Sequence, residues 1–257
     1  MTTAFAPRSA AGTGVGRALA RLGLALGAAA LLLLAAGPLG WRFGWWSFRL
    51  AFTTLMPWAF YAGVAAIAVS VAVLILGFRR GVRRGTLAAL LGLALGAVAA
   101  YFPWHASEMR GVYPPMHDIT TDFADPPSFV FAAAMRAAEQ GAGIAYPAEA
   151  AASQQKFYPG IEPAMLDVPP PEAFARALTV VKAKGWTIVS ADPASGTIDA
   201  YDRSFWFGFA DDVAIRVTAA NGGSRVDIRS GSRQGRSDFG VNAARVRGFL
   251  AALKAAS

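Results

Sequence analysis

The stretch DVAIRVTAANGGSRVDIR, residues 212–229, decides the fold of the C-terminal half of the chain. Its first part alternates apolar and polar residues, which is typical of a strand with one buried face. Asn221 and Gly222 form a strong signal for a two-residue hairpin turn. Counting outward from this turn predicts three cross-strand pairs: Val217 with Val226, Ile215 with Ile228, and Arg216 with Asp227. Because a slip of one residue would break every pair, the pattern predicts the register together with the hairpin.

The residues on both sides of the hairpin complete a domain. The predicted elements are a helix that begins at Pro171 and ends at Gly185, strands over 186–191 and 197–202, the hairpin, and a last helix capped by Ser237 or Asp238. The last helix has an apolar face made of Val246, Phe249, Leu250 and Leu253. We therefore predict an α+β core over 170–257, with a four-stranded antiparallel sheet and two helices on one face.

The segment 105–169 is rich in proline and poor in regular pattern. One helix is plausible over 127–140, with Phe129, Phe131 and Met135 as its apolar residues. We predict that the rest is an extended segment that packs on the domain, and the alternative is a tether.

Several motifs of the C-terminal half resemble the signature of the DUF1499 family. They are DDVAIRV (211–217), SRVDIRSGSR (224–233) and SDFGVN (237–242), followed by Arg245. DITTD (118–122) and DPP (125–127) resemble a motif of the bacterial, membrane-bound members. The resemblance covers roughly residues 115–255. It implies a fold and a location in the cell envelope, but no reaction, because the family is uncharacterised. Some members carry a cysteine near the start of the domain, and this chain has none.

The N-terminal part differs sharply in composition. Only 16% of the chain is charged, against about 25% in a typical soluble domain. Residues 1–104 contain nine arginines and no lysine or acid, and the arginines flank three apolar stretches. The predicted spans lie at about 20–40, 51–78 and 86–104, near the ~20 residues that a spanning helix needs. We therefore predict a membrane region over 1–104. A cleaved signal peptide is the alternative for the first span, but its apolar stretch is too long for one.

The arginines also predict an orientation. Seven of them lie in the N-terminal tail and in the loop at 79–84, and two lie in the other loop. Because positive loops stay in the cytoplasm, we expect the N-terminus inside and the C-terminal domain in the periplasm of a bacterial inner membrane. Trp41, Trp45, Trp46 and Trp104 would then lie at the outer interface. The spacings Gly23-x-x-x-Gly27 and Gly92-x-x-x-Gly96 indicate either helix-packing faces or merely an Ala/Gly-rich composition.

The sequence contains no recognisable catalytic, cofactor or metal motif. A phosphate-binding loop, a His-x-x-x-His pair and a Gly-x-Ser-x-Gly elbow are all missing, and cysteine is absent. We therefore predict no catalytic residue, no cofactor and no metal. His117 and Asp118 could form an acid–base pair, although two loop residues are the simpler interpretation.

Two groups of polar residues are the candidate sites. The first is an anion-binding site at the start of the last helix, made of Arg229, Ser232, Arg233, Arg236 and Ser237. The second is a polar cluster made of Asp118, Asp122, Asp211, Asp212, Arg216, Asp227, Asp238, Asn242 and Arg245. The alternative is structural, and it is the favoured interpretation of both groups: cross-strand ion pairs that stabilise a sheet face for the polar cluster, and a basic, Ser-rich loop whose arginines pair with Asp211, Asp212 and Asp238 for the anion site.

These observations favour an inner-membrane protein with a periplasmic binding or scaffolding domain. Its expected partners are the lipid bilayer and envelope proteins or anionic envelope ligands, and not nucleic acid, because the arginines flank apolar stretches. The alternative is an envelope enzyme that acts on an anionic substrate at the Arg229–Asp238 loop, with Asp118 or Asp122. Transport is disfavoured, since the predicted spans contain no Asp, Glu, Lys or His.

Overall fold

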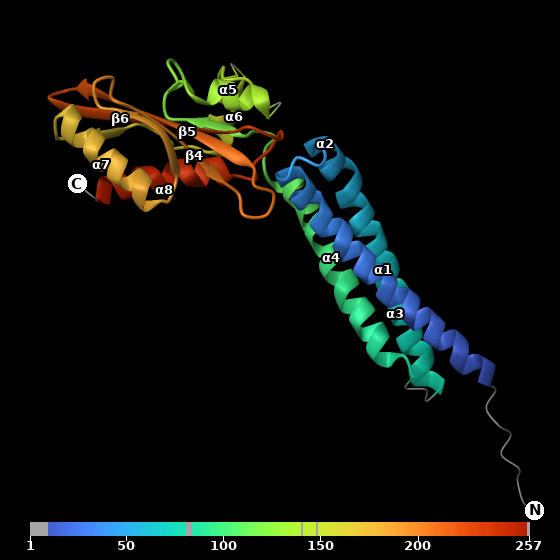
Figure 1. The fold of residues 1–257 in the computed structure, drawn as a ribbon. Helices are drawn as coiled ribbons and strands as arrows, with labels where there is room; N and C mark the ends of the chain where they lie inside the picture. Colours follow the sequence, from blue (N-terminus) through green and yellow to red (C-terminus); the bar gives the residue numbers. More distant parts are fainter. Residues whose placement is uncertain (1–9, 81–83, 140, 148, 256–257) are drawn as a thin grey trace, which may run out of the picture. The chain divides into compact units, whose positions relative to one another are not determined.

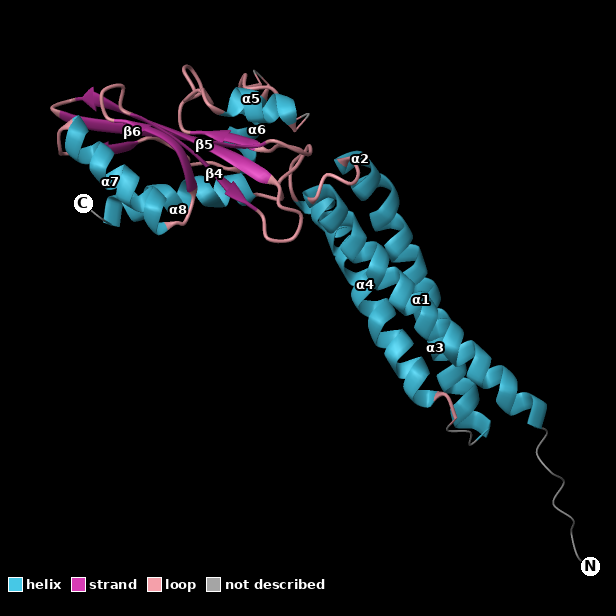
Figure 2. Cartoon of the chain, viewed as in Figure 1, coloured by secondary structure: helices cyan, strands magenta, loops and turns pink. Residues whose placement is uncertain are grey.

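The structure is a computed structural model that describes residues 10–80, 84–139, 141–147 and 149–255 (Figure 1). The chain divides into two compact units, Met1–Glu108 and Met109–Ser257. The first unit is helical, and the second contains all the strands (Figure 2). Arg8 and Arg83, which entered the orientation argument, lie outside the described residues.

Long apolar helices form the first unit, as predicted. Its elements are α1 (Ala10–Arg42), α2 (Phe48–Leu50), the π-helical η1 (Ala51–Leu55), α3 (Met56–Arg80) and all but the last four residues of α4 (Thr86–Val112). Three stretches, 14–42, 48–79 and 86–112, are long and apolar enough to cross a membrane by length and composition. They extend beyond the predicted bounds because the helices continue through the polar residues at their ends.

Glycines bring the helices of this unit into close contact. A Cβ atom on Gly92 of α4 would lie 2.8 Å from the carbonyl oxygen of Gly23 in α1. A Cβ atom on Gly63 of α3 would lie 2.7 Å from the carbonyl oxygen of Gly96 in α4. No side chain fits at such distances, so the glycines let the helix backbones meet. The interpretation of both glycine spacings as packing faces is thereby confirmed.

The second unit is built on one antiparallel sheet. Its strands are β1 (Asp118–Thr120), β2 (Ala164–Leu166), β3 (Thr187–Asp192), β4 (Thr197–Arg203), β5 (Ala210–Ala220) and β6 (Gly223–Ser232). Its helices are α5 (Ala132–Ala138), α6 (Ala150–Phe157), α7 (Pro170–Ala183) and α8 (Val241–Ala255). The strand order is β1-β6-β5-β4-β3, and β2 also pairs with β6.

The prediction of four strands was wrong, because the sheet has six. The two additional strands, β1 and β2, come from the proline-rich segment and both pair with the outer edge of β6. Each has three residues, which is too short to show an alternating pattern. They satisfy backbone groups that β6 would otherwise expose at a sheet edge. The same segment contains α5, which is shorter than the predicted helix over 127–140, and α6, which was not predicted.

The central hairpin has the predicted register. Ile215 lies opposite Ile228, Val217 opposite Val226, and Arg216 opposite Asp227. Asn221 and Gly222 have φ angles of 48° and 82°. Both values lie in the left-handed region, as a tight hairpin turn between two strands requires.

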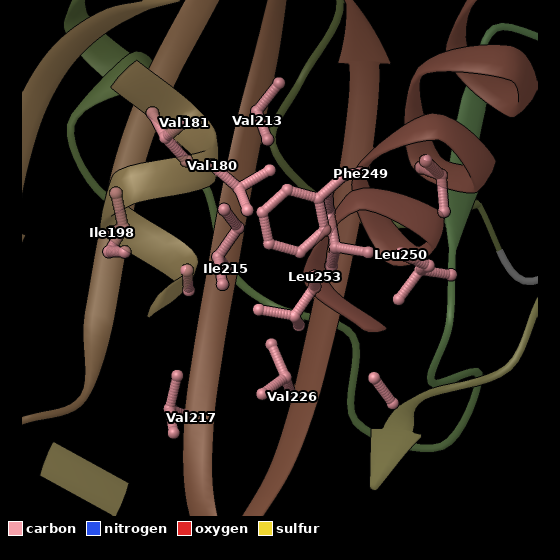
Figure 3. Close-up of a cluster of buried hydrophobic side chains, with 14 of the residues drawn as sticks. Val180, Val181, Ile198, Val213, Ile215, Val217, Val226, Phe249, Leu250 and Leu253 are labelled. Atoms are coloured by element: carbon pink, nitrogen blue, oxygen red, sulfur yellow. The ribbon is translucent and has the colours of Figure 1, made fainter. Parts of the chain in front are cut away.

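Helices α7 and α8 cover one face of the sheet and enclose the apolar core. Figure 3 shows Phe249, Leu250 and Leu253 of α8 beside Ile215 and Val226 of the hairpin. All five side chains are at least nine-tenths buried. Successive residues of a strand point to opposite faces of the sheet. The residues that alternate with these apolar residues along β5 and β6 must therefore point to the other face of the sheet.

Candidate functional site

Buried charges occupy the second face of the sheet. Figure 1 shows α5 and α6 on the side opposite α7 and α8. Seven ionisable side chains on this face are at most 6% exposed: Asp118, Arg136, Asp199, Asp212, Asp227, Arg229 and Arg233. Buried ions are costly unless they are paired, so the partners of each one decide what this face can do.

Asp118 and Arg229 form a closed pair between β1 and β6. The Nε and Nη2 groups of Arg229 donate to the two carboxylate oxygens of Asp118 at 2.9 and 2.7 Å. The guanidinium carbon lies 4.2 Å from the centre of the Phe129 ring, and Nη1 donates to the carbonyl of Pro127. The planar fork of Arg229 is therefore occupied on its edge and on its face.

Asp212 of β5 holds two further arginines. Arg136 of α5 donates from Nε to Oδ2 at 2.8 Å, and Arg233 donates from Nη2 to Oδ1 at 2.7 Å. Arg233 also donates to Glu139 at 2.9 Å, and Arg136 donates to the carbonyl of Gly231 at 2.9 Å. Sequence reasoning missed Arg136. The available signal was a single arginine within an alanine-rich segment. Such an arginine does not indicate a buried ion pair, because the pair forms only when the helix packs on the sheet.

A second group of charges lies nearer to the hairpin turn. Arg216 donates to Asp125 at 2.6 Å and to Asp122 at 3.1 Å, and Arg225 donates to Asp122 and Asp227 at 2.8 and 2.9 Å. Desolvation raises the pKa of Asp122, but hydrogen bonds from two backbone N–H groups and the charges of both arginines outweigh it and lower this pKa overall. The predicted pair between Arg216 and Asp227 is present at 3.5 Å, and it belongs to this larger network.

The rest of the predicted polar cluster lies on the face of the sheet that α7 and α8 cover, at the start of α8. Arg245 pairs with Asp211 at 2.9 Å and with Asp202 at 3.1 Å. Asn242 accepts a hydrogen bond from Ser230 at 2.6 Å and donates one to Ser232 at 2.9 Å. Asp238 accepts hydrogen bonds from the backbone N–H groups of Gly240 and Asn242, so it caps α8 as the sequence indicated. The nine residues of the cluster therefore form separate networks.

The structure does not bring the five residues of the predicted anion site together. Arg229 and Arg233 are paired with carboxylates on the α5 side of the sheet, whereas Ser232 bonds to Asn242. Ser237 donates to the carbonyl of Pro114 at 3.0 Å. Arg236 is exposed, and it has no ion pair within the part of the chain that the structure describes.

Two other groups were candidates for chemistry. Asp118 is bonded to Arg229, and the Nδ1 atom of His117 is buried without a hydrogen-bond partner among the described residues. Asp199 of β4 is 6% exposed, and burial, together with the charge of Asp212, raises the pKa of Asp199 to about 6. Within the described ranges, no group of three His, Asp or Glu side chains could hold a metal ion.

The comparisons with known proteins identify one family. The family model of DUF1499, described as a protein of unknown function, matches residues 118–253. This match covers more than half of the 257 residues and includes the sheet, α7 and most of α8. The resemblance found in the sequence motifs is therefore confirmed. No curated protein matches the chain.

Proposed function

We propose a function for this chain on the premise that it belongs to the DUF1499 family, whose function is unknown. The chain is a three-span protein of a bacterial inner membrane, with a cytoplasmic N-terminus and a periplasmic C-terminal domain. The domain acts as a binding or scaffolding module in the envelope and catalyses no reaction. Three helices of suitable length and composition support the membrane anchor, and the asymmetry of the arginines supports the orientation.

The pairing of the buried charges carries the non-catalytic part of the proposal. A catalytic acid, base or anion-binding arginine must be able to reach a substrate. The hydrogen-bonding groups of Arg229, Arg233 and Asp212 are instead engaged in ion pairs within the domain, beneath α5. Each of these three residues is at most 2% exposed. An enzyme at the Arg229–Asp238 loop would have to break these pairs before it could bind an anionic substrate.

Reporter fusions at Ser257 test the topology. One version of the full chain carries alkaline phosphatase, which is active only in the periplasm. The other carries a fluorescent protein that matures only in the cytosol. We expect phosphatase activity without fluorescence. Fluorescence without phosphatase activity would place the domain in the cytoplasm and contradict the proposal.

Paired substitutions separate the scaffold from the enzyme. Arg233→Ala combined with Asp122→Ala removes one member from each charge network on this face. A structural network predicts a clear fall of the thermal midpoint of the full chain in detergent, since the buried Asp212 loses one of its two arginine partners. An unchanged midpoint would show that these residues are kept for something other than stability, and it would favour the enzyme.

A further inference from the structure

The two edges of the sheet differ in how they are covered. β1 and β2 both pair with β6 and so cover one edge. At the other edge β3 is the last strand, and among the described strands it pairs with β4 alone. Each of its six residues is exposed or half-buried. The N–H and C=O groups on the outer side of β3 can therefore accept a further strand.

β3 has few of the features that protect a sheet edge. Natural edge strands are often protected by prolines, by lysines, by short length or by a covering segment. The strand TIVSAD (187–192) contains no proline and no lysine, and it is as long as an average strand. Its irregularity is a bulge. Ile188 and Ser190 pair with consecutive residues of β4, so Val189 is the extra residue, and it is 40% exposed.

This bulge restricts which strand can pair with the edge. A bulge increases the local right-handed twist of the strand that contains it. A flat strand from another protein matches such an edge poorly, whereas a second β3 has the same twist. An edge that pairs with its own copy forms a two-fold symmetric contact, which is closed with two chains. The bulge therefore favours a second copy of this chain as the partner.

The two ends of β3 carry opposite charges. Lys184 precedes the strand, Asp192 is its last residue, and both are exposed. Neither forms a salt bridge with any residue that the structure describes. The Lys184 ammonium lies 5.9 Å from the centre of the Trp186 ring, and Asp192 accepts hydrogen bonds from the Ser195 hydroxyl at 2.7 Å and the Ala194 N–H at 2.9 Å. The open edge thus has a positive end and a negative end.

We propose that β3 pairs antiparallel with β3 of a second copy of this chain, so that the two sheets continue across a two-fold axis. The Lys184 end of each copy then lies beside the Asp192 end of the other, whereas a parallel pair would bring like charges together. Six residues on each strand allow about six backbone hydrogen bonds. The contact is smaller than a standard interface of about 1,600 Å², so the dimer is weak. This inference goes beyond the proposed function and does not depend on the topology.

Disulfide cross-linking tests the pairing, because the chain contains no cysteine of its own. The full chain in detergent carries Val189→Cys, near the middle of β3. Two control variants are Ala194→Cys, in the turn after the strand, and Thr218→Cys, at an exposed position of β5. Antiparallel pairing about the middle of β3 separates the two copies of residue 194 by about 30 Å, so with copper phenanthroline we expect linked dimer at least about tenfold faster at 189 than at 194 or 218.

An exchange of charges tests the partner. Lys184→Glu would bring a glutamate beside Asp192 of the other copy, and Asp192→Lys would bring two lysines together. In the Val189→Cys chain, we expect each single change to slow cross-linking about fivefold and the double change to restore it, because a dimer contains two such pairs. Asp192→Asn is the control for the turn, since its amide oxygen can still accept the hydrogen bonds from Ser195 and Ala194. Its effect should be smaller than that of Asp192→Lys.

The remaining outcomes overturn the proposal. Equal rates at 189, 194 and 218 would mean that the chains meet by random collision. Fast cross-linking at both 189 and 194 would contradict antiparallel pairing. A double charge exchange that stays as slow as the single changes, while all variants keep the thermal midpoint of the parent chain, would show that the two ends do not meet. The β3 edge would then be open to a strand from a different protein.

Discussion

Ile228 and Arg229 are neighbours in β6, yet they are buried by opposite means. Ile228 is completely buried among the apolar side chains under α7 and α8. Arg229 is 2% exposed on the other face, where it is buried by an aspartate, an aromatic ring and a backbone carbonyl. One sheet therefore has an apolar face and an ionic face. The first gains free energy from the area removed from water, whereas the second is stable only while every charge keeps its partner.

The largest effect is expected from breaking the ionic face. Arg229→Ala leaves Asp118 buried without its bidentate partner, so we expect a loss of about 3–5 kcal/mol in the free energy of unfolding. Urea titration of the full chain in detergent, followed by hydrogen exchange of the β5 and β6 amide groups, measures it. As a control, Asp118→Leu combined with Arg229→Met removes both charges at similar volume and should restore most of the loss. A double variant as unstable as the single one would show that the pair itself is favourable.

A comparable truncation on the apolar face should lower the free energy of unfolding somewhat less. Ile228→Ala removes buried methylene and methyl groups and leaves a cavity, which costs about 2–4 kcal/mol. The same titration measures it, and Ile228→Val should lose no more than about 1.5 kcal/mol. If Ile228→Ala proved nearly neutral, the core under α7 and α8 would be loosely packed, and the contrast between the two faces would disappear.

A gain is expected from one acid on the ionic face. Burial and the neighbouring Asp212 raise the pKa of Asp199 to about 6, so folding disfavours its charged form. The folded state then binds more protons than the unfolded state between about pH 4 and 6, and stability falls as the pH rises through this window. Asp199→Asn should therefore add about 1–3 kcal/mol at pH 7 and almost nothing at pH 4. Unfolding titrations at both pH values check this, and a gain that did not depend on pH would contradict it.

The smallest effect is expected at the exposed edge of the ionic face. The side chain of Arg225 is 36% exposed, so its pairs with Asp122 and Asp227 are partly screened by water. We expect Arg225→Ala to cost about 1 kcal/mol or less. Raising the salt concentration should shrink that difference further. Arg236→Ala, at an exposed arginine of a loop, is the matched control and should change stability by less than about 0.5 kcal/mol.

The sequence by itself determined the parts that depend on local pattern. Alternation and the Asn221–Gly222 turn were sufficient for the hairpin and its register, because both signals are carried by adjacent residues. The three apolar helices followed in the same way from length and composition. The pairing of Arg216 with Asp227 also followed from the register alone.

Tertiary structure alone decided how the ionic face is closed. β1 and β2 have three residues each and form only because β6 offers an unpaired edge, so no pattern within 105–169 predicts them. Arg136 reaches Asp212 across 76 positions of sequence, after α5 has docked on the sheet. The sequence identified most of the charged residues, but it could not distinguish an open anion site from a closed network. The reason is physical: the availability of a charge depends on its partners in space, and these partners come from distant segments of the chain.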